Sequence, residues 1–175
     1  MAAASVGLGL LAACGSSPEP PVCPPVSVLT EAATLTRFAP GRGTDLVDVD
    51  MHAEIADIRS ACIYAKEKDG PTKLVVAVAP SIVAARGPAN ESRKADFEYF
   101  VSVIGPDRSI LNKQLFPVSI VFPGNNTRVE VVQDDPPVSI DMPPGADKDL
   151  RYQILLGLQM SEAELRYNRQ RAGMP

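Results

Sequence analysis

The chain has few of the residues on which most catalytic and metal sites depend. Its 175 residues include no tryptophan, three cysteines and a single histidine, His52. There is no Cys-x-x-Cys pair, no glycine-rich phosphate loop and no recognisable pairing of a nucleophile with a base. We therefore predict neither an enzyme nor a bound cofactor. A hydrolase that uses paired carboxylates is the least favoured alternative.

The chain also lacks the positive charge that a nucleic-acid partner requires. Its formal net charge is −4, its isoelectric point is near 5.0, and no stripe of basic residues is interleaved with aromatic ones. Nucleic acid is thus excluded from the expected partners. A hydrophobic fraction of 45% and a charged fraction of 22% are typical of a folded domain. Seventeen prolines and twelve glycines favour short strands and turns over long helices.

The first thirteen residues contain no charge, and the composition changes abruptly at Cys14, which is followed by Gly-Ser-Ser-Pro-Glu-Pro-Pro. A run of this length is too short to span a bilayer as a helix but fits the apolar part of a secretory signal. The alternative is a buried N-terminal helix, which the many small residues disfavour. No Lys or Arg precedes the run, which leaves open a translation start upstream of Met1.

The segment Leu11-Ala12-Ala13-Cys14 resembles the lipobox of bacterial lipoproteins. This resemblance implies that residues 1–13 are a signal peptide and that the Cys14 thiol receives a diacylglyceryl group. Gly15 and Ser16 follow the cysteine, a pattern similar to that of lipoproteins sorted to the outer membrane. We therefore expect a membrane partner through the lipid anchor and a location in the cell envelope, on the outer membrane and facing the periplasm. Residues 14–25 then form the lipidated, proline-rich tether.

Two cysteines remain if Cys14 carries lipid. An exported compartment permits a disulfide between Cys23 and Cys62, which would close a loop of about 40 residues and fasten the tether to the domain. Two unpaired thiols are the alternative, because pairing geometry cannot be derived from sequence.

Residues 26–175 are expected to form a single domain with about seven to nine short strands. Apolar and polar residues alternate from Leu46 to Ile55, so that Val47 and every second residue after it face the core. This segment and residues 73–79 predict a hairpin, and residues 97–104 and 109–115 predict a second one. Pro80 is expected to mark a sheet edge or a change of sheet, and Pro117 to end its strand. Residues 36–43 are interpreted as a loop with little regular structure.

The remaining segments complete the predicted fold. Further strands are predicted at residues 118–122, 127–132, 138–142 and 152–160. Ser161 and Glu164 form the pattern of a capping box, followed by a helix over residues 162–170. The strand spacing favours a mainly β fold, an antiparallel β-sandwich with one short C-terminal helix, loosely similar to immunoglobulin and fibronectin type III domains.

Three polar groups are candidate sites. Asp48, Asp50, His52 and Glu54 share one predicted strand face and are a weak candidate for a divalent cation, or simply the solvent side of a strand. Arg37, Phe38 and Arg42 place an aromatic ring between two arginines, a candidate partner contact that could equally pack against the body. Arg166, Arg169 and Arg171 could meet acidic groups or complement the dipole of the C-terminal helix.

These observations favour a non-enzymatic envelope lipoprotein whose sandwich binds a protein partner or supports an envelope assembly. The alternative is a periplasmic module that binds a small ligand or a divalent metal.

Overall fold

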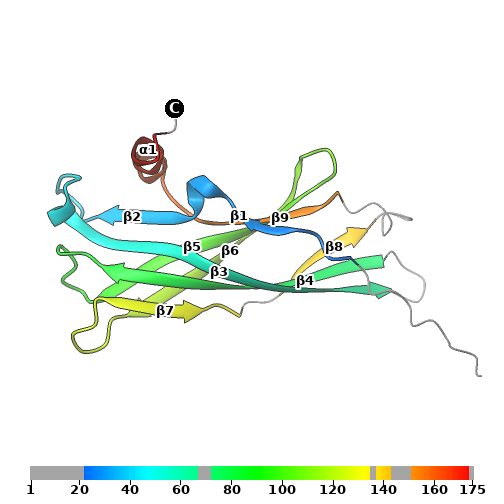
Figure 1. The fold of residues 1–175 in the computed structure, drawn as a ribbon, viewed down its shortest axis with the longest axis horizontal. Coiled ribbons are helices and arrows are strands. Elements are labelled where there is room, and N and C mark those ends of the chain that lie inside the picture. The colour runs from blue at the N-terminus through cyan, green and yellow to red at the C-terminus, as the bar shows by residue number, and fades with distance from the viewer. Residues whose placement is uncertain (1–21, 67–71, 135–136, 143–150, 174–175) are drawn as a thin grey trace, which may run out of the picture.

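A computed structural model describes residues 22–66, 72–134, 137–142 and 151–173 as two packed β-sheets and one α-helix (Figure 1). The first sheet has the strand order β1 (Val26–Val28), β9 (Gln153–Leu158), β5 (Lys94–Ile104) and β6 (Ile110–Val121). The second has the order β2 (Thr34–Phe38), β3 (Val49–Lys66), β4 (Thr72–Arg86) and β7 (Arg128–Val132), with β8 (Val138–Met142) pairing to the other half of β4. Helix α1 spans Glu162–Arg171, and short 3₁₀ turns, η1 and η2, span Thr30–Ala32 and Leu46–Asp48.

The predicted β-sandwich is confirmed, and its core follows the alternation of apolar residues along the strands. On β5 every second side chain from Ala95 to Val103 is buried, and the same holds from Ile154 to Leu158 on β9. Most strand pairs are antiparallel, but β1 runs parallel to β9. The predicted hairpins β3–β4 and β5–β6 are present, and α1 begins at the expected capping box.

The first two strands cross from one sheet to the other along one edge of the sandwich. β1 extends the first sheet, η1 turns the chain, and β2 then pairs with β3 in the second sheet. The turn packs closely on β9, because a Cβ atom built on Gly157 would lie 2.6 Å from the Ala32 Cβ atom and 2.6 Å from a ring atom of Phe100. A glycine is thus required on β9 for the chain to change sheets at this point.

A disulfide between Cys23 and Cys62 fastens the start of this crossing, with the two Cα atoms 5.7 Å apart. Cys23 precedes β1 of the first sheet, and Cys62 lies on β3 of the second. The Tyr64 hydroxyl adds a hydrogen bond of 2.9 Å to the Val22 carbonyl. The described end of the expected tether is therefore bound to the body, whereas residues 1–13 and Cys14 lie outside the described residues.

Two prolines were expected to interrupt the sheets and do not. β4 continues through Pro80, whose carbonyl accepts from the Gln133 amide at 3.0 Å. The backbone nitrogen and carbonyl of Pro80 thus point to the gap between β7 and β8, which pair with the two halves of β4. The N–H that proline lacks would have no ladder partner there, so no sheet hydrogen bond is lost. β6 continues through Pro117, which pairs with Glu98. The Glu98 carbonyl accepts from β9, so the Pro117 nitrogen points away from β5 to the free sheet edge.

Two local predictions around the β2–β3 connection are wrong. Thr36 to Phe38 belong to β2 and not to a loop, because β3 supplies hydrogen-bonding partners that the local sequence does not reveal. Leu46 and Val47 lie in the turn η2 and not on the strand, which begins at Val49. Val47 is consequently exposed, while Met51 faces the core as expected.

Removing the disulfide with Cys23→Ser and Cys62→Ser together should lower the free energy of unfolding by about 4 kcal/mol, because a bond closing a loop of about 40 residues restricts the unfolded chain. Urea unfolding measures the change. A reducing agent should destabilise the native protein by a similar amount and leave the double variant unchanged. Equal sensitivity of both proteins to reductant would contradict the structural role of this bond.

Candidate functional site

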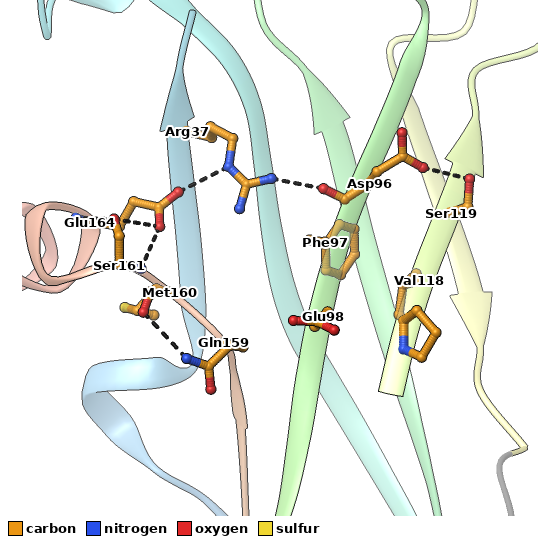
Figure 2. A pocket seen from close by; sticks show the side chains of 11 residues that line it. Arg37, Asp96, Phe97, Glu98, Val118, Ser119, Gln159, Met160, Ser161 and Glu164 are labelled. Carbon is orange, nitrogen blue, oxygen red and sulfur yellow. Dashed lines mark hydrogen bonds and ion pairs between the residues drawn. The ribbon is translucent and has the colours of Figure 1, made fainter. Parts of the chain in front are cut away.

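Arg37 connects three elements on the open edge of the sandwich. It lies two residues after the buried Leu35 and therefore points to the same inner face of β2. Its Nη1 donates to the Asp96 carbonyl of β5 at 2.7 Å, and its Nε donates to Glu164 of α1 at 3.0 Å (Figure 2). One guanidinium thus joins the second sheet, the first sheet and the helix.

Glu164 serves both as the helix cap and as the partner of Arg37. Its carboxylate accepts from the Ser161 amide at 2.7 Å and from the Ser161 hydroxyl at 2.8 Å. Burial alone would raise the pKa of Glu164, but the hydrogen bonds from Ser161 and the hydrogen bond and charge of Arg37 together hold this pKa below its ordinary value of 4.5. The carboxylate therefore stays charged to a lower pH than an ordinary glutamate.

The rest of α1 covers the free edge of β2. The Asn168 side chain donates to the Thr34 carbonyl at 2.7 Å, and the Tyr167 ring packs edge to face on Phe38 with centroids 5.0 Å apart. Arg169 forms two hydrogen bonds to the carboxylate of Glu31, at 3.0 and 3.2 Å. Arg37 and Phe38 of the predicted contact group thus pack against the body, and only Arg42 lies in the exposed loop.

A surface groove of about 770 Å³ lies between the start of α1 and strands β5 and β6 (Figure 2). Its size falls in the range of small-ligand sites. Several polar groups on its walls already bind one another, since Arg37 pairs with Glu164 and the Ser119 hydroxyl donates to Asp96 at 2.6 Å. These polar groups are therefore already used in contacts that join the helix to the sheets and β6 to β5.

The four residues proposed as weak metal ligands are not brought together. Asp48 lies in η2, whereas Asp50, His52 and Glu54 follow one another on the outer face of β3. Within the described ranges, no group of three His, Cys, Asp or Glu residues is placed to hold a metal ion. Spacing of about 7 Å between alternate residues of an extended strand accounts for this.

His52 instead binds its neighbour on β2. Its Nδ1 atom lies 3.0 Å from the Thr36 hydroxyl oxygen, and both residues line a small pocket closed by the end of α1. Thr36 is only 5% exposed, so the Thr36 side of this contact is shielded from solvent. Burial lowers the pKa of His52 below its ordinary 6.5, against the charge of Glu54 and in the same direction as those of Arg171 and Arg128.

The loop between β2 and β3 presents two aliphatic side chains to solvent. Leu46 is 75% exposed and Val47 is 66% exposed. The loop around them is closed by hydrogen bonds, because the Asp48 carbonyl accepts from the Ala39 amide at 2.9 Å and its carboxylate accepts from the Asp45 amide at 3.3 Å. Gly43 also packs on this carboxylate, so closely that a Cβ atom there would lie 2.9 Å from an oxygen. The backbone that carries the aliphatic pair is therefore held in a defined conformation.

The sequence contained a local signal for this exposed turn, but the alternation of apolar and polar residues from Leu46 onward obscured it. Asp45 and Asp48 are three residues apart, the spacing at which one carboxylate can accept from the backbone of the other residue. Such a closed turn keeps Leu46 and Val47 out of the strand, which begins at Val49. By contrast, the contact of Arg37 with Glu164 spans 127 residues and has no local signal.

Comparison with known proteins finds no matching family model, no matching curated protein and no matching solved structure. The one α-helix in the part of the chain that the structure describes has ten residues, and none there is long and apolar enough to cross a membrane.

Glu164→Gln should destabilise the protein at pH 7 by about 1 kcal/mol, because the charged acceptor of Ser161 and Arg37 is lost. The pKa of Glu164 is lower in the folded protein than its ordinary value of 4.5. Its contribution to the free energy of unfolding is therefore present above pH 4.5 and is lost as the pH falls below that value. The difference between variant and native protein should therefore shrink on acidification, as measured by urea unfolding across pH. Glu162→Gln, an exposed carboxylate in the same helical turn, is the control and should show little effect. Equal effects of the two variants would contradict the bridging role.

His52 can be titrated by proton NMR without assignment, because the chain has one histidine. Its pKa should lie below 6.5 in the folded protein, so its contribution to stability is present above pH 6.5 and decreases as the pH falls below that value. Glu54→Gln should lower this pKa further and Arg171→Gln should raise it, because the two charges act in opposite directions. Shifts of the same sign in both variants would refute this account.

Proposed function

We propose that this chain is a non-enzymatic lipoprotein of the cell envelope, anchored through Cys14 to the outer membrane, whose β-sandwich binds a protein partner in the periplasm. The anchor is supported by the similarity of Leu11-Ala12-Ala13-Cys14 to a lipobox. The binding role is supported by the exposed pair Leu46 and Val47 in a closed loop.

The exposed pair is a small apolar surface that a partner could bury. Ordering a loop on association costs free energy, so a loop whose backbone is already closed by hydrogen bonds binds more strongly than a mobile one. Leu46 and Val47 stand beside the acidic residues Asp45 and Asp48. The partner that fits this surface has an apolar pocket with basic residues at its rim.

The position of the pair supports a role away from the anchor. The loop precedes β3, whereas Val22, the first described residue, is bound by Tyr64 near the other end of that strand. β3 has 18 residues, and at about 3.3 Å per residue the two ends lie on the order of 50 Å apart. Figure 1 shows the β2–β3 loop at one end of the long axis and the C-terminal end of β3 at the other. An anchored protein would thus present Leu46 and Val47 away from its lipid.

Leu46→Ser with Val47→Ser should weaken partner binding at least about tenfold, because burying each aliphatic side chain in an interface contributes roughly 1.5–3 kcal/mol. Crosslinking in intact cells followed by affinity purification measures the loss. The control is Leu115→Ser with Val121→Ser, which removes two exposed aliphatic side chains from β6.

A protein that stays monomeric and without a partner, or equal capture by both variants, would overturn the binding role. Mass spectrometry of the same purified protein tests the anchor separately. We expect lipid mass on a chain that begins at Cys14, and an unprocessed chain in the Cys14→Ser variant. A native protein without lipid mass would overturn the lipoprotein assignment.

A further inference from the structure

A small pocket lies between strands β2 and β3 and the end of helix α1. Its volume is about 270 Å³, just below the range of sites for drug-sized ligands, so it suits an inorganic ion or a single carboxylate group. No acidic side chain is among the described residues that line it. The lining consists of Thr34, Thr36, His52, Asn168, Arg171 and Ala172.

A buried polar pair forms one wall of this pocket. Thr36 is 5% exposed, and its hydroxyl oxygen lies 3.0 Å from the Nδ1 atom of His52. Since Nδ1 is engaged in this contact, Nε2 is the ring nitrogen that remains for a ligand. Nε2 carries a proton in the charged ring, and also in the neutral ring when Thr36 donates to Nδ1. In both states the imidazole can donate a hydrogen bond to an anion.

Arg171 supplies a second donor at the pocket. The other two arginines of α1, Arg166 and Arg169, each pair with a carboxylate. Within the part of the chain that the structure describes, no carboxylate pairs with Arg171, whose guanidinium lies 5.8 Å from the centroid of the Tyr167 ring. The donors of this guanidinium are therefore left for a ligand.

The charges that act on His52 favour an anion beside it. Register pairing across four strands places Thr36, His52, Ala85 and Arg128 in one row. Arg128 and Arg171 both lower the pKa of His52, and only Glu54 acts in the opposite sense. Two positive groups and one negative group thus act on the ring, so a bound anion would be stabilised by the surrounding charge.

The carbonyl groups at the end of α1 are the features that oppose an anion here, because the C-terminal end of a helix carries partial negative charge. Two of them are already bound, since the Ala172 amide donates to the Asn168 carbonyl at 3.0 Å and the Gly173 amide to the Gln170 carbonyl at 3.3 Å. The positive charge of Arg171 lies in the same last turn. The helix end therefore does not outweigh the donors of the pocket.

We infer that this pocket binds a small oxyanion, either inorganic phosphate or the carboxylate of a short organic acid, between the Arg171 guanidinium and the Nε2 atom of His52. Such an ion accepts charge-assisted hydrogen bonds from both groups. Because Arg171 belongs to α1 and His52 to β3, the bound ion joins the end of the helix to the second sheet. This inference is independent of the proposed anchor and of the partner site at Leu46 and Val47.

The single histidine of the chain makes the ring its own reporter. The full-length protein is titrated with inorganic phosphate or with acetate, sodium chloride keeps the ionic strength constant, and proton NMR follows the His52 ring. We expect a saturable shift with a dissociation constant on the order of 1 mM. The two titrations identify which oxyanion the pocket prefers.

Bound ligand should also raise the pKa of His52, because a neighbouring anion stabilises the charged ring. By reciprocity, the affinity for the ion should increase as the pH falls through this pKa. A pH titration of the ring with and without saturating ligand measures the change. Sodium chloride at the same ionic strength is the reference, and it should leave the pKa lower than the oxyanion does.

Arg171→Gln should weaken binding of the preferred ion about tenfold, since one charge-assisted hydrogen bond is lost. The control is Arg166→Gln, which removes the same charge from the same helix at a residue that does not line the pocket. It should bind like the native protein. The affinities are compared at about pH 8, above the ordinary pKa of histidine, so that the ring is neutral in all three proteins.

A ring signal that does not saturate with either oxyanion would overturn the inference. Equal weakening in Arg171→Gln and Arg166→Gln would also overturn it, because the effect would then come from net charge alone. The same holds for a His52 pKa that is no higher with phosphate or acetate than with chloride.

Discussion

The passage of residues 26–38 from one sheet to the other is the constraint on which the rest of the structure depends. β1 and β2, joined only by η1, complete one edge of each sheet. A shift in the pairing register of this segment would therefore expose core residues of both sheets at once. Each part of the crossing is fixed by a different interaction. The disulfide at Cys23 holds its start, the contact of Ala32 with Gly157 holds its middle, and Arg37 holds its end. The two sheets are thereby joined along an edge that would otherwise open.

Helix α1 is a consequence of this arrangement, because β2 ends the second sheet and leaves its outward backbone groups without a strand partner. Asn168 supplies a donor to one of these groups, the Thr34 carbonyl, and Glu164 anchors the helix through Arg37. The opposite edge of the first sheet is protected by different means, since Pro117 offers no N–H to an incoming strand. Two of the outer strands, β2 and β6, thus carry features that disfavour pairing with another chain.

The sequence was most informative where local pattern and tertiary environment agree. The alternation in β5 and β9 and the capping box at Ser161 identified these elements, because burial on one face and hydrogen bonds within one turn are local properties. Edge strand β2 was missed since its stability comes from β3 and α1. The roles of Pro80 and Pro117 depend on which side of each strand has a neighbour. The alternation of polar residues around His52 likewise could not show that Thr36 would be its partner.

The long β3–β4 ribbon separates the entering chain at Val22 from the loop that presents Leu46. Residues 51–66 pair antiparallel with residues 72–86, with one register shift between Ile55 and Asp57, and this long ladder of hydrogen bonds transmits position rigidly. With Val22 bound near one end of β3 and Leu46 presented near the other, an orientation imposed at the entering chain is carried to the far loop. If the lipid on Cys14 holds the first end near a membrane, the length of β3 adds to the distance between that membrane and the binding loop. Partner binding would then depend on how far from the membrane the partner's own site lies, in addition to the complementarity of the two surfaces.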